Sequence, residues 1–335
     1  SVEGVASSLK NGDTVVVDGS EGAVIVNPDD NTVAEYSKKR DAFLAERKEL
    51  ENYRGRETKS ASGEAYELFC NIGKPEDAVK AVDADGEGVG LFRTEFLFMD
   101  RTSIPTEDEQ FEAYKKAALI LKGKSLIIRT LDIGGDKDIP YLGLEKEENP
   151  FMGFRAIRYC LKNRELFKSQ IKAILRASAF GDIKIMFPLI TTMDELREGK
   201  KLVAECKADL RNMGINFNEN IQVGVMVETA SAAVIADMLA KEADFFSIGT
   251  NDLTGYTMAC DRGNNDVSYL YSPLQPSVLR MIKRTIECGV QNGISVGMCG
   301  EAAANKLMIP LLISFGLTEF SVSAPSVLNV RKIIS

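Results

Sequence analysis

Residues 223–254 read VGVMVETASAAVIADMLAKEADFFSIGTNDLT and contain two short apolar runs, one over 223–228 and one over 245–249. Each run stops at polar residues, because Glu228 closes the first and Asp252 follows the second. Short uninterrupted apolar runs are typical of parallel strands buried on both faces, and the segment between them is long enough for a helix. This stretch therefore predicts a strand–helix–strand unit of an α/β fold.

The same pattern recurs along most of the chain. Amphipathic segments such as EAYKKAALILK (112–122) and DELREGKKLVAECKADLRNMG (194–214) have apolar residues at helical spacing. Segments of this kind separate most of eight predicted strands, at residues 67–72, 88–92, 125–129, 183–188, 223–228, 245–249, 294–298 and 319–324. Eight β–α repeats over roughly 270 residues predict a TIM (β/α)8 barrel, with a doubly wound open sheet as the competing architecture.

The first sixty residues follow a different pattern. DTVVVDG (13–19) and GAVIVNP (22–28) predict a pair of short strands joined by a tight turn at Ser20 and Glu21. Residues 32–59 are highly charged with sparse apolar positions, as in an exposed helix or connecting arm. We therefore expect a short strand pair over residues 1–30, a helical linker over 31–60 and the barrel over 61–335.

Composition narrows the class of protein. The 335 residues are 44% hydrophobic and 27% charged, and no apolar run approaches the length of a membrane span, so a globular protein without membrane insertion is expected. A net charge of −8 argues against a nucleic-acid partner. The six cysteines are scattered without a CxxC pair, which favours reduced thiols in the cytoplasm and disfavours a zinc site.

The chain begins with serine and no methionine, so we expect it to be a piece of a longer protein.

Polar residues directly follow the predicted strands. In a TIM barrel the loops after the strands build the active site, so these residues are the candidates. They are Arg93-Thr94-Glu95, Arg129, Asp132, Pro188, Glu228, Asn251-Asp252, Cys299-Gly300-Glu301, Ser321 and Ser323. Arg155 and Arg262 lie in further loops. Any one of the arginines could pair with a nearby carboxylate, but several together favour a doubly anionic ligand, because guanidinium groups bind phosphate and carboxylate bidentately.

Two carboxylates and one thiol complete this predicted face. Glu228 and Asp252 follow neighbouring strands, which suits Mg²⁺, although they could instead balance the arginines or cap a helix. The chain has no histidine, the usual side chain for proton transfer near neutral pH. Cys299, between glycines, is mostly protonated at pH 7 if its pKa is ordinary and could donate a proton to a basic carbon. A nucleophilic role is the alternative, but no histidine could activate it.

Several ordered motifs resemble one known family. They are GEGVGLFRTEFLFMDR (86–101), RTLDIGGDK (129–137), ENPFMGFRAIR (148–158), FFSIGTNDLTGYTMACDRGN (245–264) and VGMCGEA (296–302). This set resembles the C-terminal phosphoenolpyruvate-binding domain of Enzyme I, the phosphoenolpyruvate–protein phosphotransferase of the bacterial sugar phosphotransferase system. Pyruvate phosphate dikinase and phosphoenolpyruvate synthase share the IGTNDLT and CGE elements. The segments FLFMDR and ACDRGN resemble Enzyme I more closely than they resemble these two relatives.

The resemblance implies roles for the candidate residues. It assigns Cys299 as the proton donor, and Glu228 and Asp252 as ligands of a magnesium cofactor. It further implies that phosphoenolpyruvate (PEP) is bound by a set of polar residues: Arg93, Arg129, Asn251, Asp252 and Arg262, with Arg155 nearby. It also implies a homodimer.

In Enzyme I the phosphoryl group passes to a histidine on an upstream swivelling domain and then to the carrier protein HPr. Residues 1–30 resemble the tail of that domain. We therefore expect this chain to bind PEP and magnesium but to reach HPr only through a missing N-terminal domain. A fragment of a dikinase or synthase, and a non-catalytic module that senses PEP, remain the alternatives.

Overall fold

The computed structural model describes residues 4–19, 21–99, 101–134 and 139–335. Its contacts divide the chain into two units, residues 1–54 and residues 55–335. Ser20, at the predicted hairpin turn, lies outside the described residues, as does part of the motif at 129–137.

The first unit contains a two-stranded sheet and a long helix. Its elements are α1 (Val5–Ser8), β1 (Val15–Asp18), β2 (Ala23–Val26), α2 (Asp30–Leu50) and the 3-10 turn η1 (Glu51–Tyr53). The strands are antiparallel, with Val15 opposite Val26. Asp29 caps α2 by accepting a hydrogen bond from the Thr32 N–H, and α2 buries none of its side chains. The origin of residues 1–30 in a phosphohistidine domain and the role of residues 31–60 as a linker stay predictions.

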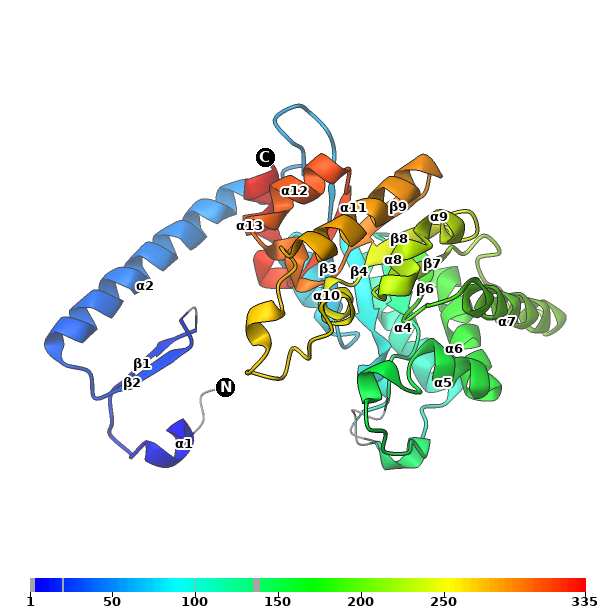
Figure 1. Ribbon diagram of the computed structural model, residues 1–335, viewed down its shortest axis with the longest axis horizontal. Coiled ribbons are helices and arrows are strands. Elements are labelled where there is room, and N and C mark those ends of the chain that lie inside the picture. The colour runs from blue at the N-terminus through cyan, green and yellow to red at the C-terminus, as the bar shows by residue number, and fades with distance from the viewer. Residues whose placement is uncertain (1–3, 20, 100, 135–138) are drawn as a thin grey trace. The chain divides into compact units, whose positions relative to one another are not determined.

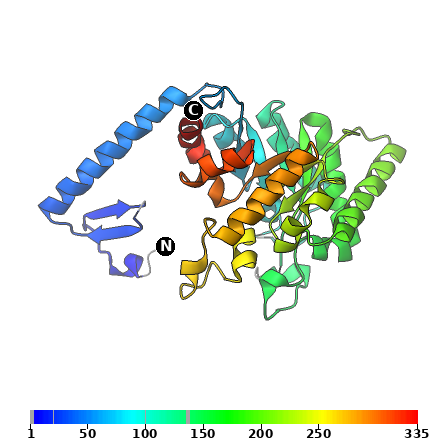
Figure 2. The same ribbon diagram turned by 45° about the horizontal axis from the view of Figure 1, so that its top comes forward.

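The second unit is a closed barrel of eight parallel strands, which confirms the predicted TIM (β/α)8 fold and excludes the open sheet. Around the barrel the order is β10-β3-β4-β5-β6-β7-β8-β9. The strands are β3 (Glu67–Ile72), β4 (Gly88–Arg93), β5 (Leu126–Arg129), β6 (Ile183–Phe187), β7 (Val223–Val227), β8 (Phe245–Ile248), β9 (Ser295–Met298) and β10 (Glu319–Val322). Figures 1 and 2 show the helices arranged around these strands.

The helices of this unit are α3 (Asp77–Asp83), α4 (Glu107–Leu121), α5 (Ile157–Lys162), α6 (Arg164–Ala177), α7 (Met193–Asn212), α8 (Ala230–Val234), α9 (Ala236–Leu239), α10 (Thr250–Met258), α11 (Pro276–Gln291), α12 (Met308–Phe315) and α13 (Val327–Ile334). Capping boxes begin α4, at Thr106 and Glu109, and α7, at Thr192 and Glu195. Within the described residues, every helix is too short or too polar to span a membrane.

Apolar side chains fill two layers. The larger layer lies between the strands and the surrounding helices, with residues such as Phe92, Phe167 and Phe187 fully buried. The smaller layer fills the inside of the barrel and consists of Leu91, Ile127, Met186, Met226, Phe245 and Cys299. Because strand residues alternate between the two layers, the last inward residues of the strands meet at one mouth.

The register of the strands places the candidate residues at a common level. Arg93 of β4 is the partner of Arg129 of β5. Ile248 of β8 pairs with Met298 of β9 and, on its other side, with Val227 of β7. The residues after these positions therefore emerge together at the carboxyl ends of their strands.

Candidate active site

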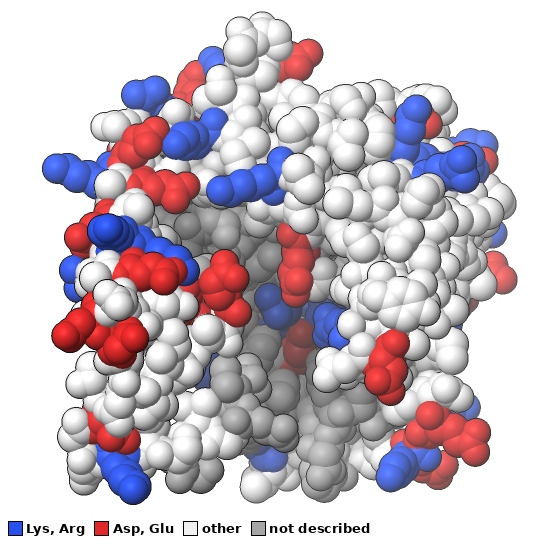
Figure 3. Space-filling model, turned by 60° about the vertical axis from the view of Figure 1, so that its left-hand side comes forward, with Lys and Arg blue, Asp and Glu red and all other residues white. Residues whose placement is uncertain are grey.

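One cavity of about 620 Å³ opens at the carboxyl ends of the strands. Every residue to which the resemblance assigns a role lines it: Arg93, Arg129, Arg155, Glu228, Asn251, Asp252, Arg262 and Cys299. Of the other candidates at the strand ends, Thr94, Pro188 and Ser321 do not line it. Figure 3 shows one face of the molecule, in which acidic and basic side chains lie close together within a hollow. A cavity walled by both signs of charge can bind an anion and a cation at the same time.

Arg129 is buried at the bottom of this cavity and is held by two carboxylates. Its Nη2 lies 2.8 Å from Glu95 Oε1, and its Nη1 lies 2.9 Å from Asp132 Oδ2. Burial alone would lower the pKa of Arg129, but the nearby carboxylates, Glu95 first, outweigh burial and raise it. The guanidinium is therefore permanently charged. Its Nε has no hydrogen-bond partner among the described residues.

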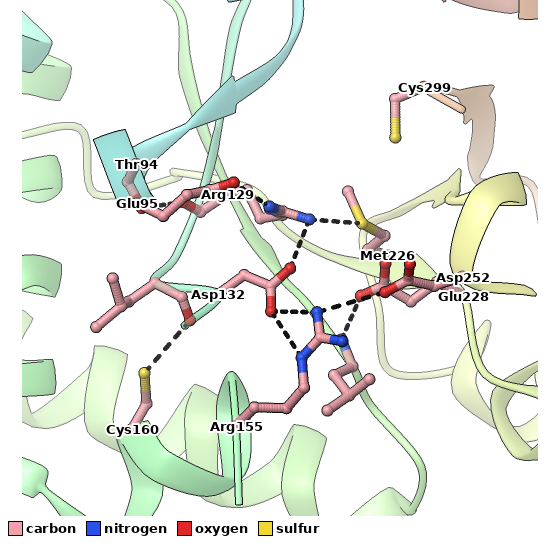
Figure 4. A network of polar contacts seen from close by, with 12 residues as sticks. Thr94, Glu95, Arg129, Asp132, Arg155, Cys160, Met226, Glu228, Asp252 and Cys299 are labelled. Atoms are coloured by element: carbon pink, nitrogen blue, oxygen red, sulfur yellow. Dashed lines mark hydrogen bonds and ion pairs between the residues drawn. The ribbon is translucent and has the colours of Figure 1, made fainter. Parts of the chain in front are cut away.

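Arg155 shares Asp132 with Arg129. Its Nη2 lies 2.7 Å from Asp132 Oδ1 and 3.4 Å from Asp252 Oδ2. Figure 4 shows the Asp132 carboxylate between the two guanidinium groups. The sequence left open whether each arginine simply pairs with a nearby carboxylate. Arg129 and Arg155 do form such pairs. The pairing also fixes their orientation, because each guanidinium is held at more than one nitrogen.

Arg93 and Arg262 differ from this buried pair. Both side chains are exposed, and neither forms an ion pair within the part of the chain that the structure describes. Both line the cavity. They are the positive charges of the mouth that no carboxylate of the described residues neutralises, so they remain available to an anionic ligand.

Glu228 and Asp252 face the same cavity from the ends of β7 and β8. Glu228 is buried, and its Oε1 accepts a hydrogen bond of 2.7 Å from the Leu189 N–H. Burial, and then the charges of Asp252 and Asp132, raise the pKa of Glu228 above its usual range. Two carboxylates that repel each other in a buried site attract a cation. Among the described residues no group of three or more Asp, Glu, Cys or His side chains could hold a metal ion.

Asn251 fixes the loop that carries Cys299. Its Oδ1 accepts a hydrogen bond of 3.0 Å from the Glu301 N–H, and its own carbonyl accepts one of 2.9 Å from the Tyr271 hydroxyl. The loop fits closely, because a Cβ atom at Gly300 would lie 1.9 Å from Thr250 Oγ1. Glycine is therefore required at position 300 by the close approach of α10.

Cys299 lies at the end of β9 and is 6% exposed. Its N–H donates to the Ile248 carbonyl at 3.1 Å, and its Sγ lies 3.8 Å from the same oxygen. Burial raises the pKa of the thiol to about 11. The sulfur therefore keeps its proton at neutral pH. All six cysteines are free and buried, and Cys299 is the one that lines this cavity among the described residues.

The structure adds two carboxylates to the site. The sequence placed Glu95 and Asp132 on the polar face but gave no signal that they would hold Arg129. Their positions, two and three residues after an arginine at a strand end, were visible. The pairing itself depends on how β4 and β5 lie side by side, which the sequence did not reveal.

Comparisons with known proteins identify the family of this chain. Residues 47–335 match a family model described as "PEP-utilising enzyme, PEP-binding domain". The chain belongs to this family. It is 50% identical over 330 residues to the phosphoenolpyruvate-protein phosphotransferase of Staphylococcus carnosus and 52% identical over 328 residues to that of Bacillus subtilis.

These matches cover 98% of the chain but only 58% of each relative, so the chain spans little more than half of the length of these relatives. Among solved structures, an HpcH/HpaI aldolase/citrate lyase family protein from Burkholderia cenocepacia covers 84% of the chain and 95% of its own length. The TM-score of that match is 0.48 at 15% identity.

Proposed function

We propose that this PEP-binding domain binds PEP with Mg²⁺ at the barrel mouth and supports transfer of its phosphoryl group, with Cys299 protonating the remaining enolate to give pyruvate. The proposal rests on one observation, which is that the predicted binding and catalytic residues meet in one cavity. Four arginines, two candidate metal ligands and a thiol come from distant parts of the chain and line a single cavity. This set matches the charges and the reacting carbon of PEP.

The arginines divide the work of binding a phosphate. Arg93 and Arg262 are exposed, line the cavity and form no ion pair among the described residues, so they can bind the phosphate or carboxylate oxygens directly. Arg129 and Arg155 are held in place by Glu95, Asp132 and Asp252, and so need little reorientation when charge spreads over the phosphoryl oxygens. Charges fixed in advance of the reaction stabilise the transition state more effectively than mobile ones.

Glu228 and Asp252 fit a magnesium ion by the chemistry of their oxygen atoms. Mg²⁺ binds hard oxygen ligands, commonly through one or two carboxylates, and completes its shell with water and substrate phosphate. Burial and the neighbouring carboxylates raise the pKa of Glu228, so a cation bound there would favour the ionised carboxylate. When bound, the ion would neutralise charge that develops on the transferring phosphoryl group.

Cys299 answers how a chain without histidine could move a proton. When the phosphoryl group leaves PEP, the C2–O enolate remains, and its C3 carbon takes the proton of the Cys299 S–H. The new C3–H bond gives the methyl group of pyruvate, and a thiolate is left at Cys299. The thiol pKa of about 11 suits a group that must hold its proton until a strongly basic carbon is formed.

The phosphoryl acceptor lies outside this chain in our proposal. The chain has no histidine, and its relatives at about 50% identity extend well beyond the matched region. By its resemblance to Enzyme I, the acceptor is a histidine of an N-terminal domain, from which HPr receives the phosphoryl group. The near-complete coverage by phosphotransferases favours this function over a dikinase or a synthase. Homodimer formation is part of the same proposal.

Isothermal titration tests this function directly. We expect PEP to bind the wild-type chain when Mg²⁺ is present and to bind at least about tenfold more weakly when EDTA removes it. Asp252→Asn should weaken the response to Mg²⁺. A matched control is Asp209→Asn on α7, which pairs with Lys172 of α6 away from the cavity lining and should bind as the wild type does. Wild-type chain that gives no heat with PEP and Mg²⁺ would reject the proposal.

Cys299→Ala separates binding from chemistry. Because the alanine removes only the proton donor, we expect PEP affinity to change little and the formation of pyruvate by the full protein to fall by about 100-fold or more. Equal losses of affinity and turnover would assign the thiol to binding. A module that only senses PEP would bind it and show no catalysis in either form.

A further inference from the structure

Asn71 lines the cavity but has no part in the chemistry proposed so far. It lies near the end of β3, and its amide contacts two other strands. Its Nδ2 donates to the Cys299 carbonyl at 3.0 Å and to the Ser321 carbonyl at 3.2 Å, while its Oδ1 accepts from the Ser321 hydroxyl at 2.7 Å. One side chain thus joins β3, β9 and β10 at the level of the thiol.

The Asn71 amide takes the place of backbone pairing between β9 and β10, which ends before Cys299 and Ser321. The ladder between β9 and β10 pairs Gly297 with Glu319 and Met298 with Phe320, and β9 ends there. The next carbonyls, of Cys299 and Ser321, accept from the two N–H bonds of Asn71. The Cys299 backbone is therefore held on one side by Asn71 and on the other by the Ile248 carbonyl, which accepts its N–H.

A bulge in β4 makes this arrangement possible. Cys70 pairs with Val89 and Asn71 pairs with Leu91, so Gly90 is the extra residue between them. A Cβ atom at Gly90 would lie 2.6 Å from the Cβ and Oγ of Ser321. Only glycine leaves room for the serine there. Bulges beside active sites commonly redirect one side chain.

The orientation of the amide is settled by its partners. Two carbonyl oxygens can only accept hydrogen bonds, so the nitrogen of Asn71 must face them. Its oxygen then faces the Ser321 hydroxyl, which donates. Ser321 is fully buried, so this hydroxyl has no competing contact with bulk water.

We propose that Asn71 is a positioning residue for the proton donor, because its amide fixes the Cys299 carbonyl and thereby aims the thiol at the reacting carbon. The inference rests on the proposed function, since it concerns the protonation of C3. A cysteine sulfur is separated from the backbone by a single rotatable bond, so its position follows the backbone closely. Moving it by about 1 Å can cost on the order of 100-fold in rate.

The proton-transfer step can be measured on this chain without a phosphoryl acceptor. In D₂O with pyruvate, Mg²⁺ and inorganic phosphate, the small fraction of Cys299 that has lost its S–H proton to the solvent takes a proton from the pyruvate methyl group, which leaves the enolate and a thiol. The thiol exchanges its proton for deuterium from the solvent and returns deuterium to C3. Loss of the methyl signal in proton NMR gives the rate of exchange.

Asn71→Asp is the sharpest variant, because aspartate has the same shape and cannot donate the two hydrogen bonds. We expect the exchange rate at saturating pyruvate to fall about 10- to 100-fold. The new carboxylate also repels an anion in the cavity, so PEP affinity is compared in Ser321→Ala, which adds no charge and should keep the Kd for PEP within about threefold of the wild type. Ser321→Ala leaves Asn71 in place but removes the donor to its oxygen, and should lower the rate about 3- to 10-fold. It also serves if the first variant fails to fold.

Asn163→Asp is the matched control. It removes a 3.0 Å hydrogen bond from an asparagine amide to the Tyr159 carbonyl, between α5 and α6, and should leave the exchange rate unchanged. The proposal is overturned if Asn71→Asp and Ser321→Ala both exchange within about twofold of the wild type. It is also overturned if the PEP affinity of Ser321→Ala falls as far as its exchange rate. Wild-type chain that binds PEP but exchanges no protons rejects the positioning role alone, whereas absent PEP binding rejects the proposed function as well.

Discussion

Two buried arginines sit at opposite ends of the barrel, and their bonding differs. Arg331 of α13 is 1% exposed near the amino ends of the strands. It donates from Nε to Thr58 at 3.0 Å and from Nη2 to the Asp85 carbonyl at 2.9 Å, pairs with the Asp85 carboxylate, and lies 3.5 Å from Glu87. Every one of its nitrogens is used.

Arg129, at the carboxyl ends, is also held by two carboxylates, but its Nε has no partner among the described residues and the side chain lines a cavity. Arg331 and Arg129 therefore show how a structural ion pair differs from one in a binding site. A buried guanidinium whose nitrogens all bond to the protein holds segments together, whereas one that also lines a cavity of charged side chains can contact a ligand.

The largest effect that would test this comparison is expected at the mouth. Arg129→Lys keeps the charge but loses the planar fork that contacts both carboxylates. We expect PEP affinity to fall about 10- to 100-fold, because a hydrogen bond to a charged group contributes about 1.5–3 kcal/mol. Calorimetric titration measures it. If the lysine variant binds PEP as tightly as the wild type, Arg129 is a structural residue like Arg331.

The converse effect is expected at the other end. Arg331→Lys replaces several hydrogen bonds to Thr58, Asp85 and Glu87 with a single point charge, and we expect it to lower the free energy of unfolding by about 2–3 kcal/mol. Urea unfolding followed by circular dichroism gives this value. PEP affinity of the folded variant should match the wild type. If Arg331→Lys lowered PEP affinity but left the free energy of unfolding unchanged, Arg331 would be a binding residue and not a structural one.

A smaller effect is expected from Glu319, a third buried ionisable residue, which lies inside the barrel. Burial, and then the neighbouring Glu67, raise the pKa of Glu319 to about 8, while Lys184 lowers it. Its carboxyl occupies space that Gly90 and Gly297 leave open. Because the folded-state pKa exceeds the ordinary 4.5, the unfolded chain holds fewer protons at this residue between about pH 5 and pH 8. Stability should therefore fall as pH rises through this window.

Glu319→Gln should remove that part of the pH dependence. The amide cannot ionise, so we expect the variant to gain about 1–2 kcal/mol over the wild type at pH 8 and to gain little at pH 5. Thermal unfolding at both pH values provides the measurement. Parallel stability curves for the two proteins would show that Glu319 does not ionise across this range.

The fold was predictable because its signal is local. Strands buried on both faces appear as unbroken apolar runs such as 223–227, and helices such as α7 carry both periodicity and a capping box in the sequence. Closure into a barrel followed from the number of repeats. The cavity residues were predictable for the same reason, since Glu228, Asp252 and Cys299 each come just after a strand.

The rest depended on contacts between distant segments. Asn71 looked like an ordinary strand residue, and its link to Cys299 spans 228 positions along the chain. Glu319 and Arg331 gave no sign in the sequence that they would be buried, because charged residues are usually exposed. Such contacts depend on which strands become neighbours around the barrel, and single-sequence patterns carry no information about that.

A crystal structure of the chain with PEP and Mn²⁺ tests the central claim most directly, because Mn²⁺ scatters anomalously and replaces Mg²⁺ at oxygen sites. We predict an anomalous peak about 2 Å from oxygen atoms of both Glu228 and Asp252, phosphate oxygens against Arg93 and Arg129, and C3 of PEP facing the Cys299 sulfur. A metal peak away from these carboxylates, or PEP bound outside the barrel mouth, would contradict the account.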